Sequence, residues 1–399
     1  MRILITTDWY APVINGVVTS VLNLENELRK MGHDVKVLTL SRNCKSYVDG
    51  DVTYIGSLGA GVIYPNARLK IPFKSKLVAD IISWKPDIIH SQCEFSTFLF
   101  AKKIAKKLDI PLVHTYHTVY EDYTHYFSPN EKWGRKAVVR FSRWVTSACE
   151  AVIAPTDKVK QMLDGYEISC PVSVIPTGIR LDKFYNADKT KSLEIRRALG
   201  IADDDFAAVY IGRLAKEKNV EELITMHSKI TDKHIKLLLV GDGPDREAIE
   251  ELVDKLDMRD RVIFAGMVKP EQVAEYYKCG DIFVSASSSE TQGLTYIEAL
   301  ASGLPVICRK DKCLDGVVED VMNGFQYTKA DEYIDVIETL STEKENVELM
   351  SKNALKSSHK FEAKLFAQRA LTLYDEAIRA YDLKKYKLTE GKKLTKCCT

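Results

Sequence analysis

Short apolar runs alternate with longer amphipathic stretches along the first half of the chain. The apolar runs predict buried strands at residues 3–6, 35–40, 87–91, 112–116 and 151–154. The stretches between them space their apolar residues closer to every 3.6 positions than to every second one, which predicts helices at residues 17–30, 74–84, 95–107 and 132–149. Repeated strand–helix units of this kind are typical of a parallel sheet covered by helices.

The same alternation restarts in the second half of the chain. It predicts further strands at residues 206–212, 236–241, 262–265, 281–285 and 305–308, with helical segments between them. We place the hinge between the halves at residues 174–179, which are followed by the polar stretch 188–191. A chain of 399 residues also exceeds what one hydrophobic core usually supports, so two domains are expected.

These patterns predict an α/β protein with two doubly wound, Rossmann-like domains. We expect a first domain at residues 1–177, a second at residues 178–362, and a C-terminal helix with a basic tail at residues 363–399 that crosses back to the first domain. The lysine-rich end, residues 384–399, is expected to fray. Because parallel sheets bind ligands beyond the carboxyl ends of their strands, the two domains are expected to face a central cleft.

Composition narrows the classes of function. The formal net charge of +1 argues against a dominant role in nucleic-acid binding. The nine cysteines are an odd number without CxxC spacing, which suggests neither a disulfide framework nor a zinc site and fits a cytoplasmic location. The apolar run at the amino terminus is too short for a signal peptide, and no later run approaches the roughly 18 residues that span a bilayer. Any membrane role is therefore expected to be peripheral.

The most informative motif is a pair of carboxylates, Glu290 and Glu298, around a loop that leads into a predicted helix. Gly293 gives the turn conformational freedom, and helix-forming residues 294–302 follow it. Free backbone N–H groups and the dipole at such a helix start attract phosphate. Glu298, about one turn inside the helix, can accept hydrogen bonds from sugar hydroxyls. The alternative is that both are ordinary surface charges.

Other candidates also lie where predicted strands end. Arg213 and Lys218 follow a strand directly, and two cations there suit a diphosphate, although they are also compatible with surface charge. Gly16 opens the first helix and would let backbone approach a phosphate, but a turn glycine explains it equally. His117 is a candidate for positioning an acceptor or a sugar, with a structural histidine as the alternative.

Two further motifs are interpreted as turns rather than as ligand-binding sites. The sequence Gly241-Asp242-Gly243 looks like part of a dinucleotide fingerprint, but Pro244 interrupts it and no third glycine follows, so it predicts a tight turn. The acidic run of residues 203–205 precedes a strand, on the edge away from the predicted cleft. It is interpreted as a solvated turn, and no metal site is predicted.

In combination, Gly16, His117-Thr118, Gly212-Arg213 with Glu217-Lys218, and the segment from Glu290 to Glu298 resemble the retaining GT-B glycosyltransferases of family four. The resemblance covers essentially the whole chain. It implies a nucleotide-sugar donor held mainly by the second domain, an acceptor held by the first, and a reaction that needs neither metal nor cofactor. The catalytic residues that it implies are His117, Glu290, Arg213 and Lys218. The donor contacts that it implies are Gly16, Arg213, Lys218, Glu290, Gln292, Gly293, Leu294, Thr295 and Glu298.

The predicted helix that contains residues 132–144 bears on the identity of the acceptor. Its aromatic stripe comprises Trp133, Ala137, Phe141 and Trp144, and its basic stripe comprises Lys132, Lys136, Arg140 and Arg143. A cationic helix with aromatic residues is typical of an interfacial membrane helix, whereas the alternative is a core-facing stripe with a solvated basic edge. A second basic and apolar stretch alternates Arg68, Lys70, Lys74 and Lys76 with Leu69, Ile71, Phe73 and Leu77.

Residues 6–21 and 117–123 resemble most the subgroup that glucosylates diacylglycerol. This resemblance implies transfer of glucose from UDP-glucose to 1,2-diacylglycerol, giving an α-monoglucosyl lipid, by an enzyme bound peripherally to an anionic surface at the inner face of the cell membrane. The side chains expected on the membrane side are Trp133, Lys136, Arg140, Phe141, Arg143 and Trp144. A soluble family-four enzyme acting on a polysaccharide, protein or small molecule remains an alternative, as does a non-catalytic nucleotide-sugar-binding protein. The identity of the hexose stays open.

Overall fold

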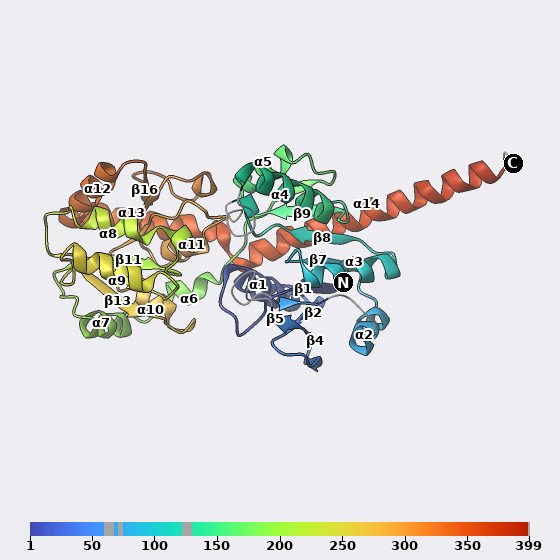
Figure 1. The fold of residues 1–399 in the computed structure, drawn as a ribbon, viewed down its shortest axis with the longest axis horizontal. Coiled ribbons are helices and arrows are strands. Elements are labelled where there is room, and N and C mark those ends of the chain that lie inside the picture. The colour runs from blue at the N-terminus through green and yellow to red at the C-terminus, as the bar shows by residue number, and fades with distance from the viewer. Residues whose placement is uncertain (60–67, 71–74, 122–129, 398–399) are drawn as a thin grey trace. The chain divides into compact units, whose positions relative to one another are not determined.

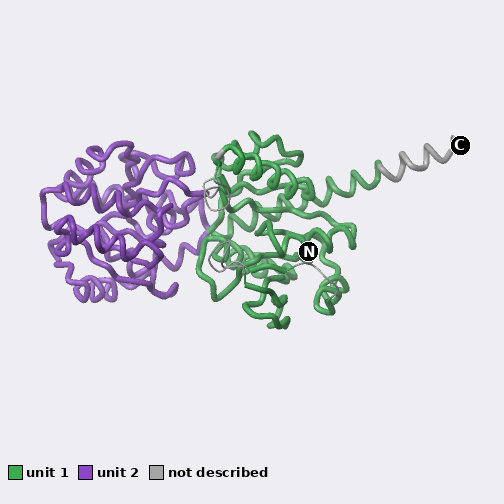
Figure 2. Tube along the Cα trace, viewed as in Figure 1, with its two compact units in different colours: residues 1–178, 363–399 green, residues 179–362 purple. Residues whose placement is uncertain are grey.

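The structure is a computed structural model that describes residues 1–59, 68–70, 75–121 and 130–397, the last ten of these by their backbone only. The chain divides into two compact units, which Figure 2 distinguishes by colour. Unit 1 comprises Met1–Gly178 with Ala363–Thr399, and unit 2 comprises Ile179–Glu362. The division lies within the segment of residues 174–179.

The main sheet of unit 1 is parallel except at one edge. Its order is β10-β9-β8-β7-β1-β2-β4-β3, and β3 pairs with β4 in the antiparallel sense. The strands are β1 (Arg2–Thr7), β2 (Asp34–Ser41), β3 (Tyr47–Asp49), β4 (Val52–Gly56), β7 (Ile88–Ser91), β8 (Leu112–Thr115), β9 (Ala151–Ala154) and β10 (Val172–Val174). A separate hairpin joins β5 (Leu58–Gly59) to β6 (Arg68–Leu69). The strand order reverses between β7 and β1, and α/β sheets bind ligands at such a switch point.

Helices cover both faces of this sheet. Successive residues of β1 point to opposite faces, so Ile3 and Ile5 pack with α1 (Gly16–Lys30) and α14 (Ala363–Cys397). Leu4 packs on the other side. Figure 1 labels the strands and helices of this unit. The helices on that second side are α2 (Lys76–Trp84), α3 (Ser96–Leu108), α4 (Glu131–Thr146) and α5 (Asp157–Gly165). Burial on both faces explains why the strands are continuous apolar runs.

Unit 2 repeats the design with a fully parallel sheet, in the order β13-β12-β11-β14-β15-β16. Its strands are β11 (Phe206–Ile211), β12 (Ile235–Val240), β13 (Val262–Gly266), β14 (Ile282–Ser285), β15 (Val306–Arg309) and β16 (Gly324–Tyr327). One face packs against α8 (Val220–His227), α9 (Arg246–Lys255) and α12 (Ala330–Thr342). The other face packs against α6 (Leu181–Tyr185), α10 (Val273–Tyr277) and α11 (Leu294–Ala301). The remaining helices are α7 (Lys189–Ala198) and α13 (Lys344–Ser358). The switch point lies between β11 and β14.

All ten predicted strands are confirmed, with each end within one residue of the observed bound. The lysine-rich end, expected to fray, was predicted wrongly, because α14 continues as one helix to Cys397. Lysine and leucine favour helix there, and Lys384 and Lys385 form ion pairs with Glu150 and Asp109. Some residues of the predicted motifs lie outside the described residues, namely Ile71, Phe73, Lys74, Asp122, Tyr123 and Cys398.

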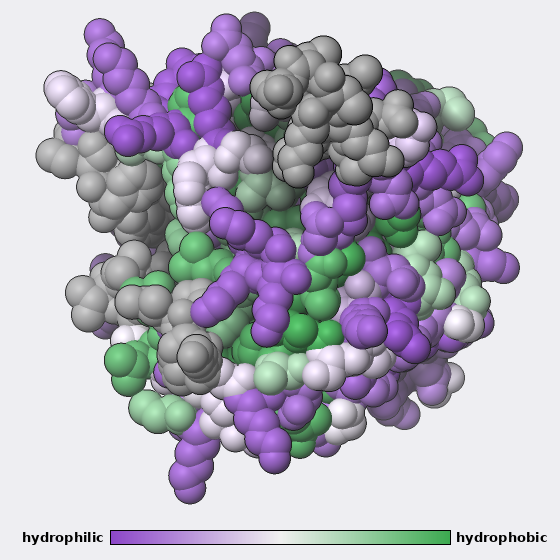
Figure 3. Space-filling model, turned by 90° about the vertical axis from the view of Figure 1, so that its right-hand side faces the viewer, coloured by the Kyte–Doolittle hydropathy of each residue, from purple (hydrophilic) through white to green (hydrophobic). Residues whose placement is uncertain are grey.

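The surface is polar over most of the face shown in Figure 3, with hydrophobic residues gathered between long hydrophilic side chains. Within the described part of the chain, no helix has the length and hydropathy that crossing a bilayer requires.

Candidate functional site

In unit 2, the charged candidates gather beyond β11 and β14, the two strands at the switch point. Arg213 lies two residues after β11, and Lys218 ends the short 3₁₀ helix η2 (Lys216–Lys218). Glu290 lies in the loop between β14 and α11. Because neighbouring parallel strands end at the same edge, residues 72 positions apart in the sequence meet here.

An ion pair connects these two loops. Lys218 Nζ lies 2.5 Å from Glu290 Oε1, and the two side chains are 26% and 15% exposed. Arg213 pairs with Glu217, whose pKa is lowered because this hydrogen bond and nearby cations outweigh partial burial. The hydroxyl of Ser289 donates to the backbone oxygen of Glu217 at 3.1 Å. The loops therefore hold two cations at partial exposure, an arrangement that suits a diphosphate.

The helix α11 begins immediately after this loop, at Leu294, as predicted. Gly293 has a φ of +72°, and a Cβ there would lie 2.6 Å from a ring carbon of Tyr296. A side chain is thus excluded both by the backbone conformation and by the tyrosine ring. Gln292 is buried, whereas Leu294 and Thr295 are partly exposed. The donor contacts implied for these residues by the family resemblance remain predictions.

Glu298 is held by a tyrosine that sequence reasoning missed. The hydroxyl of Tyr277, at the end of α10, donates to Glu298 Oε2 at 2.8 Å and lies 3.2 Å from the backbone oxygen of Thr295. Burial raises the pKa of Glu298 to about 7, while Tyr277 and the charge of Lys183 act in the opposite direction. Glu298 is therefore not an exposed helix charge. The sequence could have indicated its partner, because Tyr277 lies shortly before the strand predicted at residues 281–285.

The glycines at residues 241 and 243 serve backbone packing. A Cβ on Gly241 would lie 1.9 Å from the carbonyl oxygen of Gly212, and one on Gly243 would lie 2.1 Å from that of Leu214. The loops after β11 and β12 can approach this closely only without side chains. This is the tight turn predicted at Gly241-Asp242-Gly243.

In unit 1, the candidates lie around the switch point between β1 and β7 and on the neighbouring strand β8. Gly16 is exposed and begins α1, where Asn15 caps the helix by accepting a hydrogen bond from the backbone N–H of Val18 at 2.8 Å. His117 follows β8, and its Nε2 lies 2.6 Å from Oε1 of Gln92. Burial lowers the pKa of His117 to about 4, so the imidazole is neutral near pH 7.

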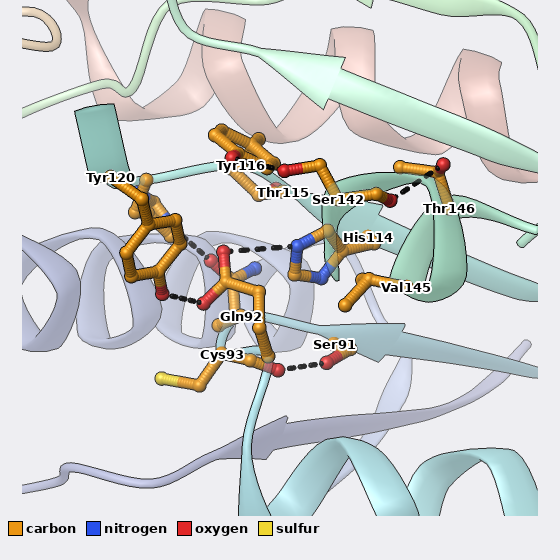
Figure 4. Close-up of polar contacts among 12 residues, drawn as sticks. Ser91, Gln92, Cys93, His114, Thr115, Tyr116, Tyr120, Ser142, Val145 and Thr146 are labelled. Atoms are coloured by element: carbon orange, nitrogen blue, oxygen red, sulfur yellow. Dashed lines mark hydrogen bonds and ion pairs between the residues drawn. The ribbon is translucent and has the colours of Figure 1, made fainter. Parts of the chain in front are cut away.

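A buried glutamate organises the adjoining loops, as Figure 4 shows for its partners. Tyr120 donates its hydroxyl to Glu94 Oε2 at 2.7 Å, and His114 Nε2 lies 3.3 Å from Glu94 Oε1. Glu94 is only 4% exposed. Sequence reasoning missed both Gln92 and Glu94, although they directly follow the strand predicted at residues 87–91.

Helix α4 exposes the two tryptophans of its aromatic stripe, whereas Phe141 packs against the core. Its buried residues are Gly134, Val138, Ser142, Val145 and Thr146. Trp133 is 73% exposed and Trp144 is 41% exposed. The predicted alternative of a core-facing aromatic stripe is therefore wrong for these two residues. Phe141 stacks on Phe95 and on Trp144 with ring centroids 5.6 and 6.1 Å apart.

The basic residues of α4 fall into two groups. Lys136 lies over the Trp133 ring at 6.0 Å, and Arg140 is exposed on the same helix. Arg143, by contrast, donates to the backbone oxygen of Tyr166 and pairs with Glu167 at 2.7 Å. In the second basic stretch, Arg68 donates two hydrogen bonds to Ser57, so its guanidinium is bound within the protein.

One cluster within the described residues has the spacing of metal ligands, namely Asp204, Asp205 and His234. Asp205 accepts a hydrogen bond from the backbone N–H of Ala202 at 2.8 Å, and His234 Nδ1 lies 3.2 Å from it. The cluster precedes β11 and β12, at the edge of the sheet away from the charged loops. These hydrogen bonds are those of a polar turn.

Comparisons with known proteins identify the family. The family models for Glycosyltransferase Family 4 and for Glycosyl transferases group 1 match residues 14–183 and 191–357. The alpha-monoglucosyldiacylglycerol synthase of Streptococcus pneumoniae is 38% identical over 332 residues, which cover 82% of this chain and 75% of that protein. The protein of the same name from Acholeplasma laidlawii is 34% identical over 393 residues, or 95% and 98% of the two chains. The chain is a family-4 glycosyltransferase.

Solved structures agree with the fold of the transferase. The structure of Anabaena Alr3699/HepE in complex with UDP and glucose matches with a TM-score of 0.75, at 18% identity, over 94% of this chain and 100% of that one. Sucrose-phosphate synthase from Thermosynechococcus elongatus matches with a TM-score of 0.74, at 21% identity, over 95% and 99% of the two chains. The predicted GT-B fold of this transferase is thereby confirmed.

Proposed function

We propose that this family-4 glycosyltransferase transfers glucose from UDP-glucose to 1,2-diacylglycerol and produces an α-monoglucosyl lipid. The observation that carries the proposal is the similarity to two alpha-monoglucosyldiacylglycerol synthases, one of them matched over 98% of its length. The charged loops of unit 2 support the donor half of the proposal. The exposed aromatic and basic face of α4 supports the lipid half.

The proposed reaction breaks the bond between the anomeric carbon and the diphosphate of UDP. The oxygen of the acceptor hydroxyl bonds to that carbon, its proton passes to the departing phosphate, and UDP leaves with the bonding electron pair. Negative charge thus accumulates on the diphosphate, where Arg213 and Lys218 stabilise it. Glu298 holds the ribose hydroxyls, Glu290 contacts the sugar, and His117 positions a substrate hydroxyl.

Access to diacylglycerol requires contact with a membrane surface. We infer that α4 makes this contact, since Trp133 and Trp144 are exposed and cationic side chains lie beside them. Inserting such rings gains apolar burial, and lysine or arginine gains from anionic headgroups. The enzyme is therefore proposed to bind peripherally at the inner face of the cell membrane.

Flotation with lipid vesicles tests the membrane half. The full-length protein is expected to float with vesicles that contain anionic lipid and to remain below neutral ones. Equal behaviour with and without anionic lipid contradicts peripheral binding of the proposed kind. Hydrolysis of UDP-glucose by the purified protein tests the donor half separately, because a non-catalytic nucleotide-sugar-binding protein releases no UDP.

A further inference from the structure

A series of buried hydrogen bonds lies behind His117 in unit 1. Gln92 Oε1 is 2.6 Å from His117 Nε2, and Gln92 Nε2 is 3.1 and 3.3 Å from the two ring nitrogens of His90. His90 in turn bonds the hydroxyl of Thr115 at 2.7 Å and that of Tyr374 on α14 at 2.6 Å. Gln92 and His90 are fully buried. Their partners within the protein therefore fix how these side chains are oriented.

The sheet itself fixes the position of Gln92. It is the first residue after β7, and its backbone N–H donates to the carbonyl oxygen of Thr6 on β1 at 2.8 Å. These are the two strands at the switch point of unit 1. Figure 4 shows the Gln92 side chain among the polar contacts beyond these strand ends.

The orientation of the Gln92 amide follows from the chemistry of His90. Burial holds the pKa of His90 well below its ordinary value, so its ring is neutral and rich in electrons. The amide N–H groups of Gln92 lie against this ring. Rotating the amide would place a carbonyl oxygen there instead, which is electrostatically unfavourable. The carbonyl oxygen therefore faces His117, and only a protonated Nε2 can donate to it.

We propose that Gln92 is a positioning residue that holds His117 in the Nε2–H tautomer, so that Nδ1 presents a lone pair to a substrate hydroxyl. The inference rests on the proposed function for the role of His117, a residue that is partly exposed. A lone pair accepts a hydrogen bond from a hydroxyl and cannot donate one to an anionic oxygen. The group bound at Nδ1 is therefore a neutral hydroxyl rather than a carboxylate or sulfonate.

The tautomer can be observed directly by nitrogen NMR of the full-length protein with ¹⁵N-labelled histidine, with the His117 signals assigned by their loss in His117→Ala. The expected spectrum at pH 7 shows a protonated Nε2 and an unprotonated Nδ1. A proton on Nδ1 overturns the proposal. Because this readout needs no turnover, it separates failure of the inference from failure of the proposed reaction.

Replacing the amide by a carboxylate gives a second, kinetic test. Gln92→Glu still accepts the Nε2 proton but places a negative charge beside His117, which raises the pKa of that imidazole above about 4. Both Gln92→Glu and its reference are measured in a Glu298→Gln background, because Glu298, with a pKa of about 7, would otherwise set the acid limb. Neutral His117 is the competent form, so kcat/KM falls as pH drops through the raised pKa. The acid limb of the profile is expected to move up by roughly one to two pH units.

Among the described residues, the titratable groups that face His117 are Glu94, His114 and His90, and all of them remain in the variant. Gln368→Glu makes the same charge change on the exposed surface of α14 and is expected to leave the acid limb in place. Thermal unfolding verifies that Gln92→Glu is folded. An acid limb that coincides with that of the reference overturns the proposal.

Gln92→Leu removes the hydrogen bond altogether. The histidine is then free to exchange tautomers, and kcat/KM is expected to fall by roughly 10- to 100-fold, the range found when a group that orients a metal-bound histidine is removed. NMR should show both tautomers of His117. An unchanged Nε2–H signal in this variant contradicts a role for Gln92.

Discussion

Both units have a sheet of mainly parallel strands covered by helices, but the polar residues beyond the strand ends differ in charge and in burial. In unit 2, Lys218 pairs with Glu290 and Arg213 with Glu217, and these charged side chains are partly exposed. In unit 1, His117 is neutral and bonds a fully buried amide, Gln92. Charged groups at partial exposure suit a diphosphate, whereas a neutral network suits hydroxyl groups. The same α/β fold can thus supply two kinds of recognition to one reaction.

The largest effect is expected from removing a charge in unit 2. Lys218→Ala and Glu290→Ala should each lower kcat/KM by about 10²- to 10³-fold. Lys218→Ala removes preorganised positive charge at the leaving group, and Glu290→Ala removes the proposed contact with the sugar and the ion pair that holds Lys218. Lys216→Ala, on the same 3₁₀ helix but exposed, is the matched control and should turn over normally. Near-normal transfer in either site variant, measured with UDP-glucose and diacylglycerol, counts against the assignment.

Glu298→Gln should weaken UDP binding by about tenfold at pH 8, equivalent to about 1.4 kcal/mol. The pKa of Glu298 is about 7, so in the wild type the ionised form is lost, and UDP binding weakens, as pH falls through 7. The variant should lack this pH dependence in calorimetric titrations. An identical pH dependence in both proteins would show that another group is responsible.

The same substitution should stabilise the protein without ligand. Burial raises the folded-state pKa of Glu298 above its ordinary value of 4.5, so its ionisation lowers stability as pH rises from about 4.5 through 7. Glu298→Gln is therefore expected to unfold at a higher temperature than the wild type at pH 8 and to lose that advantage near pH 4. A variant that is less stable than the wild type at pH 8 contradicts the claim that burial of ionised Glu298 lowers stability.

Substitutions on the exposed surface of α4 in unit 1 should change membrane binding and leave UDP binding unchanged. Trp133→Ala removes a ring that is 73% exposed, and binding to anionic vesicles should weaken about tenfold while UDP binding stays unchanged. Leu349→Ala, an exposed apolar residue of unit 2, serves as the control in the same flotation assay. A loss of UDP affinity in Trp133→Ala would show that the ring supports the fold instead.

The smallest effect is expected from single cations on α4. Arg140→Gln should weaken binding to anionic vesicles about fivefold, which corresponds to about 1 kcal/mol per charge near the surface. The difference should shrink at high salt, where the charge is screened. Lys356→Gln on α13 is the control. A salt-independent difference would assign Arg140 a structural role.

The sequence predicted the strands well because buried parallel strands are continuous apolar runs, as in residues 151–154. It missed β3, β4, β5, β6, β10 and β16. Of these, β3 and β5 are fully exposed, the three residues of β10 are only partly buried, and β4 and β16 are buried at only some positions. Such strands carry no strong hydrophobic pattern. Their place is set by pairing with a neighbour.

For the candidate site, the sequence indicates which residues end a strand but not which side chains meet. Tyr277 lies 21 positions from Glu298, and Gln92 lies 25 positions from His117. Each contact depends on the order of strands in the sheet, which sequence patterns leave open. The exposed position of Trp133 likewise depends on which face of α4 packs on the sheet.

Transfer of glucose to diacylglycerol is best tested by a radiolabelled assay with the full-length protein and diacylglycerol in vesicles, across UDP-glucose, UDP-galactose and other donors. We expect a labelled α-monoglucosyl lipid in the organic phase with UDP-glucose and its loss in Lys218→Ala. Label that enters only water-soluble acceptors, with none in lipid, would contradict it.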